Sequence, residues 1–157
     1  GDEFGQSTEW NENKSLDWHL TEFPPHRGLL DFVSALNKTY KEQPALYQKS
    51  FSRDGFQWIE HGDDENSVFV YLRKGYDRND DVVVILNLTP IVRQNFRIGV
   101  PYSGIWTEVL NSDDTKFYGS GVIGTDYKSE DKHWMQCDQS ISLTLPPLGG
   151  VILKRKN

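Results

Sequence analysis

Apolar residues follow a helical spacing in one part of the chain, between residues 26 and 42. There Leu29, Val33, Leu36 and Tyr40 recur every three or four residues, as on one face of a helix. The pair Pro24-Pro25 comes just before, and proline is tolerated in the first turn, where its missing N–H would have no partner. Pro44 ends the pattern. These positions predict one helix over residues 26–42.

From about residue 47 the hydrophobic pattern changes to alternation, which is typical of strands. The predicted strands are residues 56–60, 67–73, 82–88, 92–98, 105–110, 141–145 and 151–154. Residues 82–88 are apolar on both faces, so we expect them to form a central strand. The connections are rich in Asp, Asn, Gly and Pro, as turns are. Short strands at this spacing predict an antiparallel β-sandwich and a mainly β fold.

Residues 1–25 have no clear period and are interpreted as a long loop with a short turn of helix. Nothing in this segment offers a second layer for the predicted helix. The apolar helix face therefore indicates a missing partner, and the chain alone could hide that face in a homodimer.

Composition and charge exclude several classes of function. The 157 residues carry 17 Lys and Arg against 23 Asp and Glu, a net charge of −6 that disfavours binding to nucleic acid. No stretch reaches the ~18 apolar residues of a membrane helix, and no secretory signal is recognised. The single cysteine, Cys137, fits a reducing compartment, so we expect a cytoplasmic protein. The absence of an initiator Met indicates a processed, tagged or cut chain.

Three motif-like patterns do not predict a cofactor, a metal or a nucleophile. The glycines of residues 119–124 match a dinucleotide pattern, but the neighbouring residues predict neither the preceding strand nor the following helix. Residues 77–81 have the spacing of a calcium loop without its turn Gly or its final Glu. Cys137 and His133 are too few for zinc, and the surroundings are too acidic to activate the thiol. The acidic clusters 63–65 and 113–114 are interpreted as solvated turns.

The tryptophans are more informative. Trp10 and Trp18 lie in the N-terminal loop among side chains that can bond sugar hydroxyls: Glu9, Asp17 and His19. Flat rings stack on the C–H faces of sugars, so this loop is a candidate sugar-binding segment. The alternative is that both rings anchor the loop onto a neighbouring domain. Trp58 and Trp106 lie within predicted strands, where core or interface roles are expected.

Several segments in order along the chain carry a family resemblance: Gly1–Gln6, Glu9-Trp10, Ser15–Leu20, His26–Gly28, Gly55–Ile59, Asn87–Pro90, Gly104–Asp113 and Leu143–Leu148. Together they resemble the end of the glycogen (1,4-α-glucan) branching enzymes, members of the α-amylase superfamily (glycoside hydrolase family 13). The resemblance covers nearly the whole chain.

The resemblance implies the C-terminal fragment of a larger enzyme. Residues 1–46 would be the tail of a (β/α)8 catalytic barrel, a loop and its last helix, and residues 47–157 an α-amylase-type C-terminal all-β domain. Such enzymes transfer α-1,4-glucan segments to form α-1,6 branches by retaining transglycosylation, which uses two carboxyl groups. In the family these lie on earlier barrel strands, so no catalytic residue is assigned here and the fragment alone is expected to be inactive.

The resemblance also implies that the N-terminal loop borders the glucan cleft of the complete enzyme. The residues placed there are Glu9, Trp10, Asp17, Trp18 and His19. The partners implied are α-glucan, through the parent enzyme, and the missing catalytic barrel. Two alternatives stay open: a stand-alone α-glucan-binding β-sandwich module, and a purely structural domain.

Overall fold

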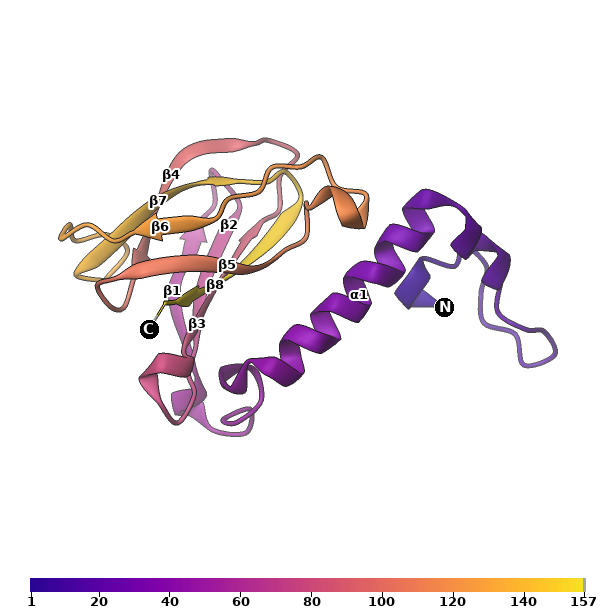
Figure 1. The fold of residues 1–157 in the computed structure, drawn as a ribbon, viewed down its shortest axis with the longest axis horizontal. Helices are drawn as coiled ribbons and strands as arrows, with labels where there is room; N and C mark the ends of the chain where they lie inside the picture. The colour runs from indigo at the N-terminus through magenta and orange to yellow at the C-terminus, as the bar shows by residue number, and fades with distance from the viewer. Residues whose placement is uncertain (157) are drawn as a thin grey trace.

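The computed structural model describes residues 1–156 and shows one α-helix beside a β-sandwich (Figure 1). Helix α1 spans Pro24–Glu42. The strands are β1 (Phe56–Asp63), β2 (Val68–Arg73), β3 (Val82–Asn87), β4 (Arg93–Val100), β5 (Ile105–Asn111), β6 (Asp126–Lys128), β7 (Gln139–Leu145) and β8 (Gly149–Arg155). One sheet has the order β1-β2-β3-β8-β5-β6 and the other pairs β4 with β7, all antiparallel. The mainly β fold predicted from the sequence is confirmed.

The predicted elements are found close to their expected bounds, with two differences. Helix α1 begins two residues earlier than expected, because Pro24 and Pro25 occupy its first positions. Strand β6 was not predicted: it has three residues and pairs only with the end of β5. Strand β3 lies between β2 and β8, and its first four residues are all buried, which confirms the central strand.

The core of the sandwich lies between the two sheets and is built by alternate residues of each strand. In β2, Val68, Val70 and Leu72 are buried while the residues between them are partly exposed. Trp106 is fully buried in this core, as expected, and its indole Nε1 donates to the carbonyl oxygen of Tyr102 at 3.2 Å. Burying the ring with its one donor satisfied stabilises the sandwich.

A second apolar cluster joins α1 to the outer face of the six-stranded sheet. Phe32 and Ala35 of α1 pack against a set of sheet and loop residues: Ala45, Val82, Val84, Leu110, Phe117 and Ile152. Leu29, Leu36 and Tyr40 remain exposed on the helix. The chain's own sandwich therefore covers part of the apolar face of α1 and leaves part of it open.

The N-terminal segment packs on the first half of α1, which corrects the expectation that it offers the helix no second layer. Phe4, in the short turn η1 (Asp2–Phe4), is fully buried. Its carbonyl oxygen lies 2.7 Å from Nδ1 of His26. A second turn, η2 (Trp18–Glu22), leads into the helix. Figure 1 shows this segment at the far end of α1, away from the sandwich.

Candidate functional site

The N-terminal loop forms a small hollow that contains two of the residues predicted to meet a sugar. Glu9 and Asp17 line this hollow, whose volume is about 240 Å³. Asp17 is held from both sides: its backbone N–H donates to Oε1 of Gln6 at 2.9 Å, and its Oδ2 accepts from Oγ1 of Thr8 at 2.7 Å. The loop is therefore shaped by its own hydrogen bonds, and the Asp17 carboxylate keeps a fixed position within it.

The other three predicted residues lie outside this hollow and are exposed. Trp10 is 75% exposed and Trp18 is 51% exposed, and His19 is exposed next to Trp18 in η2. The Trp18 ring packs on Phe4, with ring centroids 5.0 Å apart and planes tilted by 35°. Because Phe4 is fully buried, it provides Trp18 with a rigid support while much of the indole stays open to solvent. Such a ring can stack on a ligand at little cost in conformational entropy.

A second aromatic surface lies on β1 and β2, and Trp58 belongs to it. The sequence predicted a core or interface role for Trp58, and the structure excludes the core: Trp58 is 45% exposed, because its neighbour Ile59 takes the inward position. Phe56 meets the Trp58 ring edge-on at 4.9 Å and 88°, and stacks on Tyr71 at 5.2 Å and 29°. Burial raises the pKa of Tyr71. The exposed Phe56 and Trp58 and the half-buried Tyr71 thus form a cluster, in which the Trp58 ring is not coplanar with the other two.

The glycine-rich loop is organised around Asp113, which sequence reasoning missed. Asp113 is only 8% exposed, which corrects its interpretation as a solvated turn. Its carboxylate accepts three hydrogen bonds, from N–H and Oγ of Ser120 at 2.8 and 2.7 Å and from N–H of Val122 at 2.8 Å. The loop follows β5, and no helix begins on its glycines within the described residues. No local sequence pattern signals this role, because the donors lie seven and nine residues further along the chain.

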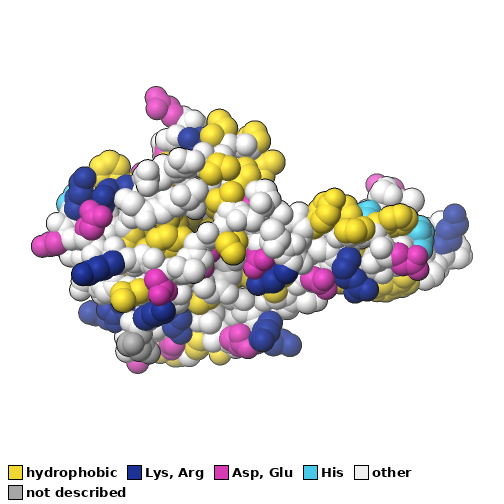
Figure 2. Space-filling model, turned by 45° about the horizontal axis from the view of Figure 1, so that its top comes forward, with side chains coloured by type: hydrophobic (Ala, Val, Ile, Leu, Met, Phe, Trp, Pro, Cys, Tyr) yellow, Lys and Arg dark blue, Asp and Glu magenta, His cyan; other side chains and the backbone are white. Residues whose placement is uncertain are grey.

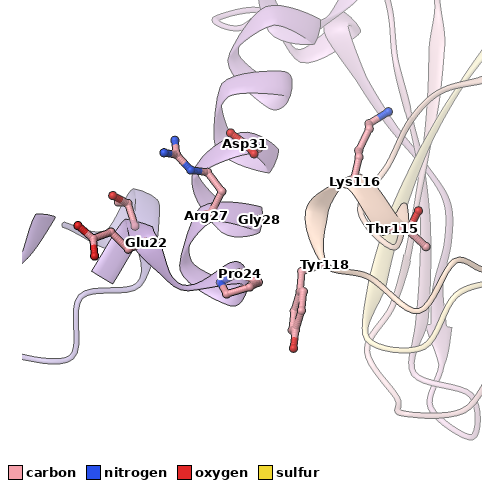
Figure 3. Close-up of a pocket in the computed structure, with 9 residues that line it drawn as sticks. Glu22, Pro24, Arg27, Gly28, Asp31, Thr115, Lys116 and Tyr118 are labelled. Carbon is pink, nitrogen blue, oxygen red and sulfur yellow. The ribbon is translucent and has the colours of Figure 1, made fainter. Parts of the chain in front are cut away.

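The same loop closes onto α1 and leaves a cleft between them (Figure 3). Turn η6 (Thr115–Phe117) begins after Asp114, whose side chain accepts from N–H of Lys116 at 3.0 Å and pairs with its Nζ at 2.7 Å. These bonds to Lys116 lower the pKa of Asp114. The cleft measures about 460 Å³ and is lined by Thr21, Glu22, Pro24, Arg27, Gly28, Asp31, Thr115, Lys116 and Tyr118. None of these residues was predicted from the sequence as part of a site.

The described residues contain little that could carry metal or nucleophilic chemistry. No group of three His, Cys, Asp or Glu side chains suited to a metal ion occurs within residues 1–156. Burial raises the pKa of the Cys137 thiol, which opposes the thiolate that a nucleophile requires. None of the helices in the same residues has the length and apolar character needed to span a membrane.

Comparisons with known proteins agree with this architecture. The family model described as "Alpha amylase, C-terminal all-beta domain" matches residues 58–156. Proteins named 1,4-alpha-glucan branching enzyme GlgB are similar to the chain: 46% identical in Rubrobacter xylanophilus over 98% of this chain, and 43% in Aquifex aeolicus over 99%. A third, from Cellvibrio japonicus, is 44% identical over 98%. The chain spans 21 to 25% of the length of these curated relatives.

One solved structure shares the fold at low sequence identity. The crystal structure of the MUTB F164L mutant, from crystals soaked with trehalulose, superposes with a TM-score of 0.52 at 18% identity. The match covers 89% of this chain and 21% of that one. It supports the arrangement of the helix and the sandwich as a fold and says nothing further about chemistry.

Proposed function

This chain belongs to the family of the α-amylase C-terminal all-β domain, and we propose that it forms the C-terminal part of a 1,4-α-glucan branching enzyme. The observation that carries the proposal is the extent of the similarity. Identity of 43 to 46% runs over 98 to 99% of the chain, so it includes the N-terminal loop and α1, which the family model does not match. Residues 1–46 are accordingly assigned to the end of a catalytic barrel and residues 47–157 to the all-β domain.

The proposal divides the chemistry between this chain and the remainder of the protein. Retaining transglycosylation needs a nucleophilic carboxylate and an acid/base carboxyl group about 5–5.5 Å apart. We assign both to the barrel strands that precede this chain, because none of the superfamily's catalytic segments occurs in its sequence. The chain by itself would then be inactive, and its part would be to complete the barrel and to shape the edge of the glucan cleft.

The N-terminal loop is the part of the chain that we place at the glucan. Its hollow fixes Asp17 beside Glu9, and the exposed indoles of Trp10 and Trp18 with His19 supply apolar and polar contacts nearby. The Trp18 ring, supported by Phe4, is the member best suited to stack on a glucose unit. Because the buried Phe4 already holds the Trp18 ring in place, glucan binding would not have to order that ring, and this lowers the entropic cost of binding.

The open apolar surface of the chain supports the assignment to a larger protein. Between α1 and the six-stranded sheet lies a groove of about 470 Å³, lined mainly by apolar side chains that include Leu36, Tyr40, Tyr71 and Ile152. Figure 2 shows hydrophobic side chains gathered in patches on the sandwich and along the helical arm. We propose that the remainder of the enzyme covers this groove. In the isolated chain a second copy could do so, and sedimentation velocity would then give a dimer.

The buried free thiol of Cys137 is compatible with a reducing compartment, so we propose that the protein works in the cytoplasm. Fractionation of the source cells would test this, and recovery of the protein outside the cytoplasm would contradict it.

A second candidate function rests on the aromatic cluster of Phe56, Trp58 and Tyr71. A stand-alone α-glucan-binding module would use such exposed rings without any chemistry of its own. It would bind maltoheptaose through Trp58 and would show no partner protein in the cell. The third alternative, a purely structural domain, would bind no glucan at all.

The proposed function predicts that the complete polypeptide encoded by the gene converts linear α-1,4-glucan into branched product. Proton NMR of the product from amylose should show new α-1,6 anomeric signals, and the iodine absorbance should fall. The 157-residue chain alone should give neither change. A complete polypeptide that leaves amylose unchanged, while other enzymes of this class act under the same conditions, would reject the function.

A further inference from the structure

The cleft between α1 and the glycine-rich loop has the size and the rigidity of a ligand site. Its volume of about 460 Å³ falls within the range of about 300–1,000 Å³ found for small-molecule sites. The two walls are fixed to each other where Gly28 of α1 meets the loop. A Cβ at Gly28 would lie 2.5 Å from the carbonyl oxygen of Phe117, so only glycine permits this approach. The Asp113 hydrogen bonds hold the loop from behind.

Tyr118 forms part of the loop wall of this cleft, and its conformation is unusual. Its φ is 68°, in the left-handed region, which is unfavourable for a residue with a Cβ. Its side chain is nevertheless 63% exposed, so burial of the ring does not offset that cost. Figure 3 shows Pro24 on the helix side and Tyr118 on the loop side of the cleft, facing each other. The fold thus holds a flat apolar surface open beside the cleft.

The polar groups of the cleft are available to a ligand. Within residues 1–156 the side chains of Glu22, Arg27 and Asp31 take part in no hydrogen bond or ion pair with the protein, whereas Lys116 is paired with Asp114. Acceptors and donors are both present, because the free charged groups are the carboxylates of Glu22 and Asp31 and the guanidinium of Arg27. This combination disfavours an anion, and among residues 1–156 it forms no group of three side chains suited to a metal cation. It suits a neutral ligand with many hydroxyl groups and an apolar face.

We propose that this cleft binds a saccharide chain, with one sugar ring stacked on Tyr118 and the hydroxyls of other sugars in the chain bonded by Glu22, Arg27 and Asp31. The choice of an α-1,4-glucan as that chain rests on the proposed function. Turn η2 supplies Thr21 and Glu22 to the cleft and carries Trp18 at its other end. The cleft is therefore a separate subsite next to the loop that we place at the glucan, and it can hold a neighbouring part of the same polymer.

The test uses the 157-residue chain labelled with ¹⁵N and titrated with maltoheptaose, with cellohexaose as the control sugar. Amide shifts are expected for residues 21–23, 26–31 and 115–119. In Tyr118→Asn, which suits the left-handed backbone and removes the ring, the Kd of that site should rise about tenfold or more. Tyr118→Phe keeps the ring and should stay within about twofold of the original. Tyr76→Asn removes another exposed tyrosine, which lies outside the cleft, and should leave the Kd of that site unchanged.

Several results would overturn the inference. In the titration with maltoheptaose, these are amide shifts confined to the Trp58 cluster or the Trp18 loop, or no amide shifts at all. An equal affinity for cellohexaose, or an unchanged Kd for maltoheptaose in Tyr118→Asn, would also overturn it. Thermal melts of each variant show whether it is folded, and a Tyr118→Asn chain that melts early is replaced by Tyr118→Gly, which also suits the left-handed backbone. Each of these failures leaves the proposed function standing, because branching by the complete polypeptide is measured separately.

Discussion

Replacing Asp113 by alanine is expected to lower the free energy of unfolding by about 3 kcal/mol, because it removes the buried, charged acceptor of three part-buried hydrogen bonds in the loop. The N–H groups of Ser120 and Val122 would lose the hydrogen bonds that close the loop. Hydrogen bonds to charged groups contribute roughly 1.5–3 kcal/mol each, and their effects within one network do not add. Urea unfolding followed by tryptophan fluorescence measures the difference.

The control for this variant is Asp64→Ala. Asp64 is exposed in the turn between β1 and β2, so its removal should change the free energy of unfolding by less than about 0.5 kcal/mol. Asp113→Asn keeps the shape and loses the charge, and should fall between the two. If Asp113→Ala and Asp64→Ala unfold at the same urea concentration, Asp113 does not hold the loop.

Replacing Trp18 by alanine in the complete polypeptide is expected to lower kcat/KM for branching about 10- to 100-fold. The reason is that the glucan would no longer be held in the correct position at the reacting groups. The exposed part of the indole would no longer meet the glucan, while Phe4 beneath it would lose only one neighbour. Trp18→Phe keeps a ring on Phe4 and should recover most of the activity. Initial rates of α-1,6 bond formation against amylose concentration give the two kinetic constants.

The matched control for Trp18 is Trp134→Ala, which removes an exposed indole from a loop of the sandwich. Its kcat/KM should stay within about twofold of the original. Melting temperatures of both variants separate a loss of contact from a loss of folding. Unchanged kinetics in Trp18→Ala, with unchanged stability, would remove the N-terminal loop from the glucan cleft.

The strands could be predicted because burial repeats along the chain in a simple way. Residues 68–73 alternate between core and surface, and residues 82–85 are buried on both faces, so pattern and position agree. Strand β6 could not be found this way, because its three residues are set by pairing with β5 rather than by burial. Trp58 and Ile59 are both apolar neighbours, so the pattern gave no indication of which one faces the core.

The site was harder to predict than the fold because it depends on contacts between distant residues. Asp113 looks like any acidic turn residue, and its burial follows from donors seven and nine positions later. The left-handed conformation of Tyr118 has no sequence signal, since Gly119 beside it is the usual choice for that region. Gly28 and Phe117 meet across 89 residues, and only the folded chain brings the two walls of the cleft together.

The proposed function requires this chain to be one part of a longer enzyme. The most direct test is an immunoblot of the source cells with an antibody against residues 47–157, which gives the mass of the native polypeptide. The account predicts a band at four to five times the 18.1 kDa of this chain, as the 21 to 25% coverage of its relatives implies. A single native band near 18.1 kDa would contradict it.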